Sequence, residues 1–167
     1  DSQTVIDSIP VVLLCTKTFR DNVAIQSEAC GAIASIIRFS PSNKERVWQN
    51  SGIDSVVAAF DCSYDPCQLE TMTQYEDLCV VTKIRACNVL ISLAVDPIIL
   101  SDMEEKGIST KFERLLEEDS NIPAELMGVV QRLLDLVSDK ENSDRKLVFR
   151  EDSSEEKTCD CIRANLR

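Results

Sequence analysis

The chain has 167 residues, of which 44% are apolar and 28% are charged, and its formal net charge is -11. This composition excludes a disordered chain and a membrane-spanning one, and the length suits one domain or a section of a repeat array. The negative charge argues against a general nucleic-acid binder, because phosphates would be repelled. The absence of His argues against acid–base or nucleophilic catalysis, and the scarcity of Gly and Pro indicates an all-α fold.

The first half of the chain predicts a series of helices. Residues 6–14 predict a helix with Pro10 near its start, where a missing N–H costs little. A long helix is expected over residues 24–39, and Pro41 then begins a short helix that ends before the Gly-Ile pair at 52–53. The next helix carries an apolar stripe, which consists of Val56, Val57 and Phe60.

The same order recurs in the second half at an offset of 57 residues. Residues 28–36 align with residues 85–93, with Ala, Cys and Ser at identical places. Pro97 then begins another short helix that ends before the Gly-Ile pair at 107–108, and a striped helix follows. The stripe of that helix consists of Phe112, Leu115 and Leu116. A third long helix is expected over residues 124–137. Its apolar face consists of Leu126, Val130, Leu133, Leu134 and Val137.

The chain divides into a helical part and a charged tail. Residues 1–138 are expected to form helical repeats, with an insertion at residues 61–75 that is either a surface loop or the extended start of the next helix. Residues 139–167, with 7 basic and 8 acidic residues, are too charged to bury a core, so we expect a flexible tail. Because the chain starts at Asp1 without a signal-like segment, we also expect a piece of a longer protein.

A short helix that ends in Gly and an aliphatic residue resembles the first helix of the armadillo repeat. This pattern stands at residues 41–53 and again at residues 97–108. The resemblance implies an armadillo-like solenoid fragment, a right-handed superhelix of α-helices with about two to three repeats. The insertion explains why Gly52 and Gly107 are 55 residues apart, when armadillo units run at about 40–47 residues. An ordinary helical bundle is the alternative arrangement.

Close packing of helices and tight turns between them explain the small residues in the repeat. Ala29 and Ala86 would let neighbouring long helices approach each other. Gly52 and Gly107 would allow a left-handed turn between helices. The single Trp, Trp48, is expected in the core between repeats.

The resemblance also implies a groove, lined by the long helices, that binds extended peptides or protein surfaces. Nuclear-import receptors of this family carry a Trp and, four residues on, an Asn on each long helix. The matching places here hold Gly31 and Ser35, then Asn88 and Ser92, so the import-receptor mechanism is not expected. The candidate binding residues at the groove and its rim are Ser35, Arg38, Asn88, Ser92, Gln131 and Asp135.

The predicted function is a non-enzymatic protein–protein interaction module, a scaffold, adaptor or regulatory subunit without a cofactor. Residues 1–138 hold 11 basic and 21 acidic residues, which favours a protein partner with a basic segment over nucleic acid or a membrane. We expect the protein to reside in the cytoplasm or the nucleus, because its cysteines are interpreted as reduced thiols.

The alternative function is a thiol-based redox or metal-binding regulator. The close pairs Cys62/Cys67 and Cys159/Cys161 would supply the reactive or ligating sulfur atoms. Without His, any zinc site would need thiolate or carboxylate ligands alone.

Overall fold

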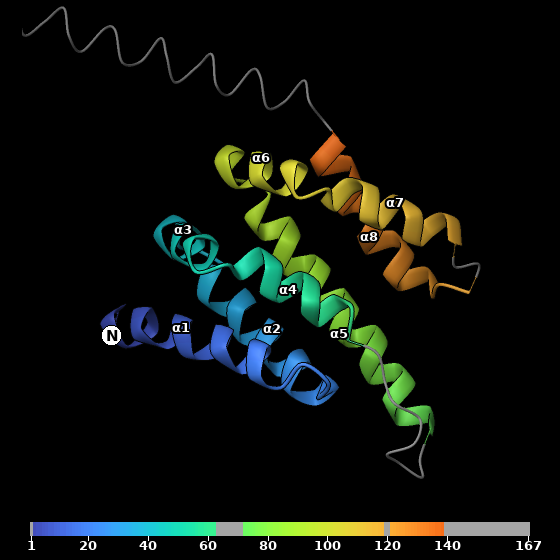
Figure 1. The fold of residues 1–167 in the computed structure, drawn as a ribbon, viewed down its shortest axis with the longest axis horizontal. Coiled ribbons are helices and arrows are strands. Elements are labelled where there is room, and N and C mark those ends of the chain that lie inside the picture. The colour runs from blue at the N-terminus through green and yellow to red at the C-terminus, as the bar shows by residue number, and fades with distance from the viewer. Residues whose placement is uncertain (1, 63–71, 119–120, 139–167) are drawn as a thin grey trace, which may run out of the picture.

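The computed structural model describes residues 2–62, 72–118 and 121–138. Within these ranges every regular element is an α-helix, so the all-α prediction is confirmed for the described part of the chain (Figure 1). The helices are α1 (Ser2–Thr18), α2 (Val23–Ile37), α3 (Pro41–Gln49), α4 (Gly52–Phe60), α5 (Met72–Leu93), α6 (Pro97–Glu105), α7 (Ile108–Glu118) and α8 (Ala124–Ser138).

The helices form two layers. The three helices α2, α5 and α8 lie side by side, because α2 packs against α5 and α5 packs against α8 (Figure 1). The other layer consists of α1, α4 and α7, which pack on α2, α5 and α8 respectively. The short helices α3 and α6 connect each long helix to the following helix of the other layer.

The repetition in the sequence appears as two successive units, α2–α3–α4 and α5–α6–α7. Both short helices have nine residues and begin with a Pro, whose missing N–H is not needed at that position. Ser40 caps α3 by accepting a hydrogen bond from the N–H of Asn43, and Asp96 caps α6 by accepting one from Ile98. Cys30 and its counterpart Cys87 are both fully buried.

Side chains of the first unit contact those of the second at both ends of the units. The rings of Phe60 and Phe112 meet edge to face, with their centroids 4.7 Å apart. The indole N–H of Trp48 on α3 donates a hydrogen bond of 2.8 Å to the carboxylate of Asp102 on α6. Trp48 also packs against the core, as the sequence predicts.

The turn before α4 differs from the prediction. Gly107 has φ +68°, the expected left-handed conformation, but in the first unit the left-handed residue is Ser51, with φ 60°. Gly52 is instead required by space, since a Cβ there would lie 2.5 Å from the carbonyl oxygen of Val47 and would also clash with its side chain. The assignment of a left-handed turn to Gly52 is therefore wrong, because close approach of α3 decides that position.

The place of Pro10 in the first helix also differs from the prediction. α1 begins at Ser2, so Pro10 lies in its middle rather than near its start. An interior Pro removes a backbone hydrogen bond of the helix, and the ring of Pro10 itself is exposed. Burial of Ile9 and Leu13 in the same helix offsets this cost.

The end of α1 is tied to α2 by a buried amide. The Nε2 of Gln26 donates hydrogen bonds of 2.9 Å to the carbonyl oxygen of Thr16 and 2.7 Å to that of Phe19. The carbonyl of Thr16 is among those that a helix end leaves unpaired, whereas that of Phe19, just beyond α1, also accepts a hydrogen bond from the N–H of Asn22 at 3.1 Å. Gln26 thereby completes the C-terminus of α1 from the neighbouring helix.

The insertion and the tail are only partly covered by the structure. Residues 72–75 belong to α5, in agreement with the extended-helix alternative for the end of the insertion. Residues 63–71 and the charged tail, residues 139–167, lie outside the described part of the chain. None of the helices described is both long enough and apolar enough to cross a membrane.

We expect Gly52→Ala to lower the free energy of unfolding by about 1–3 kcal/mol, because the added methyl group would overpack against the backbone of Val47. Urea unfolding followed by circular dichroism measures the change. Gly128→Ala is the matched control, since its Cβ would meet nothing within 4 Å inside α8. That variant should gain about 0.5–1 kcal/mol. Equal effects of the two substitutions would contradict the assignment.

Candidate protein-binding face

The exposed side of α5 forms the centre of the candidate site. α2, α4 and α8 cover the other sides of this helix, as their packing shows. The uncovered residues recur every three or four positions, the spacing of one helix stripe. They include the exposed residues Asp77, Val81 and Asn88, with Ser92 half-buried. We name this layer surface, formed by α5 with α2 and α8 beside it, the long-helix face.

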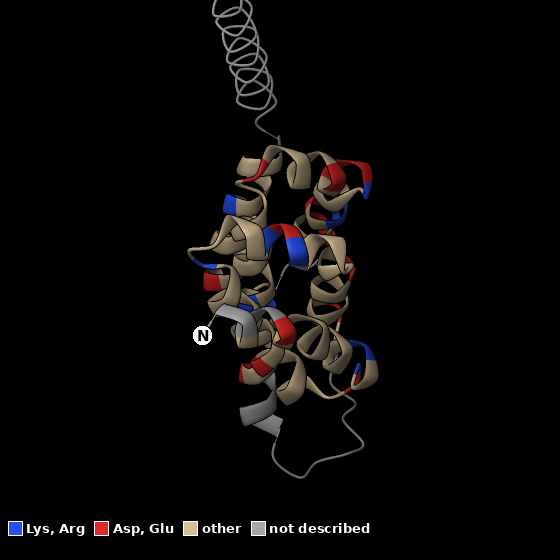
Figure 2. Cartoon of the chain, turned by 90° about the vertical axis from the view of Figure 1, so that its left-hand side faces the viewer, with Lys and Arg blue, Asp and Glu red and all other residues tan. Residues whose placement is uncertain are grey.

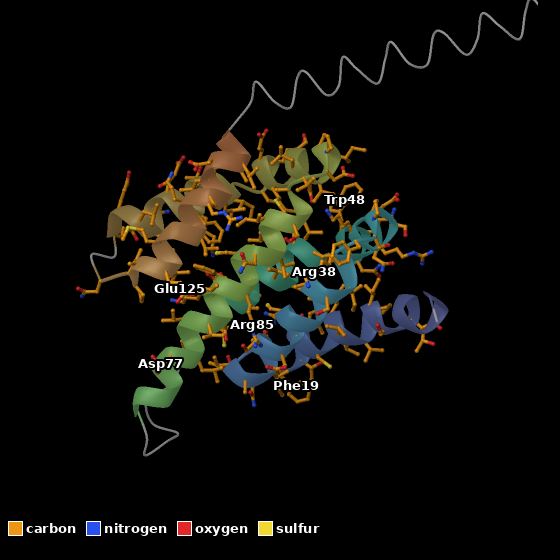
Figure 3. All side chains as sticks on the ribbon, turned by 180° about the vertical axis from the view of Figure 1, so that it is seen from behind. Phe19, Arg38, Trp48, Asp77, Arg85 and Glu125 are labelled. Carbon is orange, nitrogen blue, oxygen red and sulfur yellow. The ribbon has the colours of Figure 1, made fainter. Side chains whose placement is uncertain are left out.

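The six residues predicted as a binding site all lie on this layer. Ser35 is near the end of α2 and Arg38 follows it, while the others form one-turn pairs on α5 and α8. Those pairs are Asn88 with Ser92 and Gln131 with Asp135. All six are exposed except Ser92, which is half-buried. Figure 3 shows this layer toward the viewer, with Arg38 on the α2 side and Arg85 on α5.

Several of these polar groups are already bonded within their own helix. The hydroxyl of Ser35 donates to the carbonyl of Gly31 at 2.9 Å, and that of Ser92 donates to Asn88 at 2.8 Å. The Nε2 of Gln131 donates to the carboxylate of Asp135 at 3.0 Å. The two serines therefore offer a ligand mainly acceptor atoms. Asn88 presents an exposed carboxamide, which can both donate and accept.

Apolar side chains on the same layer were missed by sequence reasoning. Phe39 is 88% exposed, and the guanidinium of Arg38 lies 5.4 Å from the centre of its ring. Val81 is 40% exposed on the α5 stripe, and Val95, at the place of Arg38 in the second unit, is 56% exposed. Their exposure depends on which neighbours cover a helix, which periodicity alone does not tell.

Arg85 is a second residue that sequence reasoning missed, and its role is to join α5 to α2. Its Nη1 donates to the carbonyl and the hydroxyl of Ser27, at 3.0 and 3.1 Å, and to the carboxylate of Glu28 at 2.8 Å. Glu28 is exposed, so the ion pair itself contributes little. The bonds to Ser27 lie closer to the interface and fix the contact between the two helices.

Charge on the three long helices, counted over all their residues, is close to balanced. α2, α5 and α8 together hold five acidic and three basic residues. Residues 96–105, at α6, hold four acidic residues and no basic one. Figure 2 shows acidic and basic segments interspersed over the helices rather than separated onto two sides. The acidic excess of the helical array is therefore concentrated away from these three helices.

Burial favours the neutral form of three cysteine thiols, those of Cys30, Cys62 and Cys87. Burial raises the pKa of Cys30 to about 12, against a smaller opposing effect of Arg85, and burial together with Cys30 raises the pKa of Cys87 to about 12. The pKa of Cys62 is also raised by burial, and its thiol donates to the carbonyl of Arg20 at 3.1 Å. The remaining members of the two close Cys pairs, Cys67, Cys159 and Cys161, lie outside the described residues.

Potential metal ligands do not gather in the described part of the chain. Within residues 2–62, 72–118 and 121–138, no three His, Cys, Asp or Glu side chains are placed to hold a metal ion. Cys62 is buried there, and its thiol donates a hydrogen bond to the carbonyl of Arg20. The alternative of a metal-binding regulator stays a prediction for the pairs that the structure does not describe.

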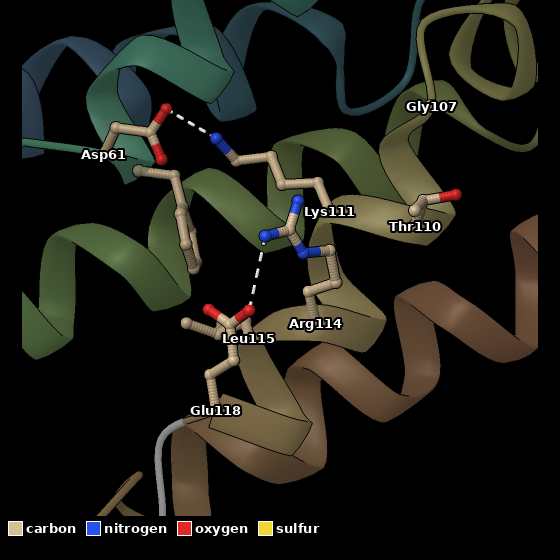
Figure 4. Close-up of a pocket in the computed structure, with 8 residues that line it drawn as sticks. Asp61, Gly107, Thr110, Lys111, Arg114, Leu115 and Glu118 are labelled. Carbon is tan, nitrogen blue, oxygen red and sulfur yellow. Dashed lines mark hydrogen bonds and ion pairs between the residues drawn. The ribbon is translucent and has the colours of Figure 1, made fainter.

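A pocket of about 570 Å³, lined by both charged and apolar side chains, lies between the end of α4 and α7 (Figure 4). Its two cations are already paired. Lys111 binds Asp61 at 2.6 Å, and Arg114 binds Glu118 at 3.3 Å. An anionic ligand would have to displace one of these carboxylates, so the pocket is a weaker candidate than the long-helix face.

Comparison of the chain with protein-family models, with curated proteins and with solved structures gives no match. Any functional assignment therefore depends on the geometry described above.

We expect Arg85→Met to lower the free energy of unfolding by about 1 kcal/mol, because the carbonyl and hydroxyl of Ser27 lose their donor. Glu28→Gln should cost less than about 0.5 kcal/mol, since its ion pair is exposed. Urea unfolding at low and high salt measures both. An Arg85→Met effect that vanishes at high salt would assign its role to the ion pair instead.

Cys30 and Cys87 should resist alkylation by iodoacetamide at pH 8 in the native protein, because the reactive thiolate is disfavoured by burial. Mass spectrometry of the digested protein gives the modification of each thiol, with the half-buried Cys79 as an internal comparison. Denatured protein supplies the control in which all thiols react.

The same raised pKa values predict how stability depends on pH. In the unfolded chain a thiol ionises near pH 8.5, whereas the folded thiols stay neutral to about pH 12. Their stabilisation is therefore complete below the unfolded pKa and is lost as the pH rises toward 12. The free energy of unfolding should fall from about pH 9 upward, less steeply in Cys87→Ala than in the native sequence.

Proposed function

We propose that the chain is a non-enzymatic protein-interaction module that binds a segment of a partner protein across the long-helix face. In this proposal the helices continue as an armadillo-like right-handed superhelix, with α2, α5 and α8 on the concave side. The observation that supports it most directly is the stripe on α5, where the exposed carboxamide of Asn88 lies two turns from the exposed side chain of Val81. Val95, just beyond the end of α5, is also exposed.

The dimensions of the face suit a short extended peptide. Packed helices lie about 8–10 Å apart, so three of them span about 20 Å. An extended chain covers this distance with about six residues. The carboxamide of Asn88 can bond the N–H and C=O of such a segment, while Val81 and Phe39 supply apolar contacts. Gln131 and Asp135 extend the polar contacts onto α8.

The net negative charge of the whole helical array favours a basic segment of the partner. Individual ion pairs on the long-helix face contribute little to this preference. The helical part of the chain is acidic, while the three long helices together are nearly balanced. A basic partner would be attracted at long range, and its specificity would come from hydrogen bonds and apolar contacts on the face.

Selection from a displayed peptide library tests the proposal. Peptides that bind the native protein should carry Lys or Arg, and Asn88→Ala should weaken their binding about tenfold, because a buried hydrogen-bonding group of the peptide loses its partner. Anisotropy titrations measure the dissociation constants. Glu113→Ala, an exposed change on α7 in the other layer, is the matched control and should leave binding unchanged. Peptides indifferent to Asn88→Ala would place the binding surface elsewhere.

A further inference from the structure

Helix α6 exposes one of its sides to solvent. Ile98 and Glu105 lie two turns apart on this side and are both exposed, whereas Ile99 and Met103 of the same helix are buried. Ile98 is 51% exposed, and Val95, just before the helix, is 56% exposed. The exposed side of α6 is therefore apolar at its N-terminal end.

The C-terminal end of the same helix is acidic. Residues 96–105 hold four acidic residues and no basic one. Asp96 caps the helix, and Asp102 accepts the indole N–H of the previous unit. The other two, Glu104 and Glu105, are exposed.

The nearest cation in the sequence is engaged elsewhere. The Nζ of Lys106 donates to both carboxylate oxygens of Asp54 on α4, at 3.1 and 3.2 Å. Glu104 and Glu105 also lie in the last turn of a helix, where the helix dipole disfavours negative charge. A basic group brought to this end of α6 would therefore be attracted by the two carboxylates and by the dipole.

The charged tail contains a segment of complementary character. Residues 145–150 read Arg-Lys-Leu-Val-Phe-Arg, so three basic residues flank three consecutive apolar ones. The sequence after α8 holds no other run of three large apolar residues. Apolar contacts together with opposite charges favour docking of this segment on α6.

The position of α8 brings the segment within reach. α8 packs against α6, and Figure 1 shows the end of α8 beside α6. Six residues, 139–144, separate α8 from Arg145 and span up to about 20 Å when extended. The nine residues of α6 cover only about 14 Å. The whole exposed side of α6 is therefore accessible to the segment without any change in the helices.

We propose that residues 145–150 dock on the exposed side of α6 in the same chain. The apolar residues of the segment contact Ile98 and Val95, and its basic residues lie near Glu104 and Glu105. A short tether gives an effective concentration in the millimolar range, so a contact of low intrinsic affinity is sufficient. The inference does not rest on the proposed function, which centres on α5.

Limited proteolysis of the full chain by trypsin tests the docking. Initial cleavage after Arg145, Lys146 and Arg150 should be at least about fivefold slower than in a synthetic peptide of residues 139–167, because a docked segment cannot enter the protease. Cleavage after Lys157, outside the segment, should proceed at the same rate in both. Mass spectrometry of early fragments gives the rate at each site.

Variants of α6 locate the contact. Ile98→Asp removes the apolar contact, and Glu104→Lys with Glu105→Lys reverses the charge, so each variant should raise cleavage of the segment at least about threefold. All three positions are exposed, and circular dichroism checks that the helices are retained. Val11→Asp, an exposed apolar position on α1, is the matched control for Ile98→Asp. It should leave cleavage unchanged, as should Asn88→Ala on the long-helix face.

A charge exchange tests the pairing directly. When Glu104→Lys and Glu105→Lys are combined with Arg145→Glu and Lys146→Glu, protection should return. Arg150 remains as the cleavage site that reports it.

Four results would overturn the inference. The first is equal cleavage of the segment in the full chain and in the free peptide. The second is protection that neither Ile98→Asp nor the charge reversal weakens. The third is protection that Asn88→Ala removes, because the tail would then occupy the long-helix face. The fourth is protection that falls on dilution, because the segment would then bind a second copy of the chain.

Discussion

Close packing of α5 against three neighbours is the constraint on which the other contacts depend. The helix touches α2, α4 and α8, and its inward positions are fully buried. Small residues such as Ala86 and Cys87 let the neighbours approach, and a well-packed interior tolerates little change of volume there. With three sides covered, only one stripe of α5 remains for contact with a partner. The long-helix face is therefore a consequence of how the core is packed.

Polar contacts between units determine how neighbouring helices align with one another. They contribute only a small part of the free energy of unfolding. Arg85 fixes α5 to the backbone of α2, and the bond between Trp48 and Asp102 joins the short helices. Gln26 does the same for α1 by completing its last turn from α2. A single hydrogen bond contributes on the order of 1 kcal/mol, whereas the apolar surface buried between helices contributes far more. These directional bonds select one alignment among several that hydrophobic packing alone would allow.

Much of the helical order follows from the sequence, because caps and periodicity are local. Pro41 and Pro97 begin the short helices as predicted, and the apolar face of α8 is buried at Leu126, Val130 and Leu133. Prediction from the local sequence failed where contacts with residues distant in the sequence determine the backbone conformation. The sequence Ser51-Gly52 does not tell that Ser51 takes the left-handed conformation, nor that Gly52 is required by its close approach to Val47. For Pro10, tertiary burial of Ile9 and Leu13 outweighs a helix-breaking preference.

The candidate site was predictable only in outline, for the same reason. Repeat alignment places Asn88 and Ser92 on the uncovered side of α5, but it considers two positions on each helix and so passes over Val81 and Val95. Arg85 looks like a surface charge in the sequence, and only the position of α2 shows that it is a structural contact. Exposure of an apolar side chain is a property of the assembled layer, not of the helix that carries it.

The contact between Trp48 and Asp102 has a consequence for spectroscopy. Trp48 is the single indole chromophore of the chain, and its N–H lies against a carboxylate of the next unit. Its emission wavelength and quenching therefore depend on the distance between α3 and α6. Sliding or separation of the two units would be recorded by one native fluorophore, without any label, whereas melting confined to α8 would leave that signal largely unchanged.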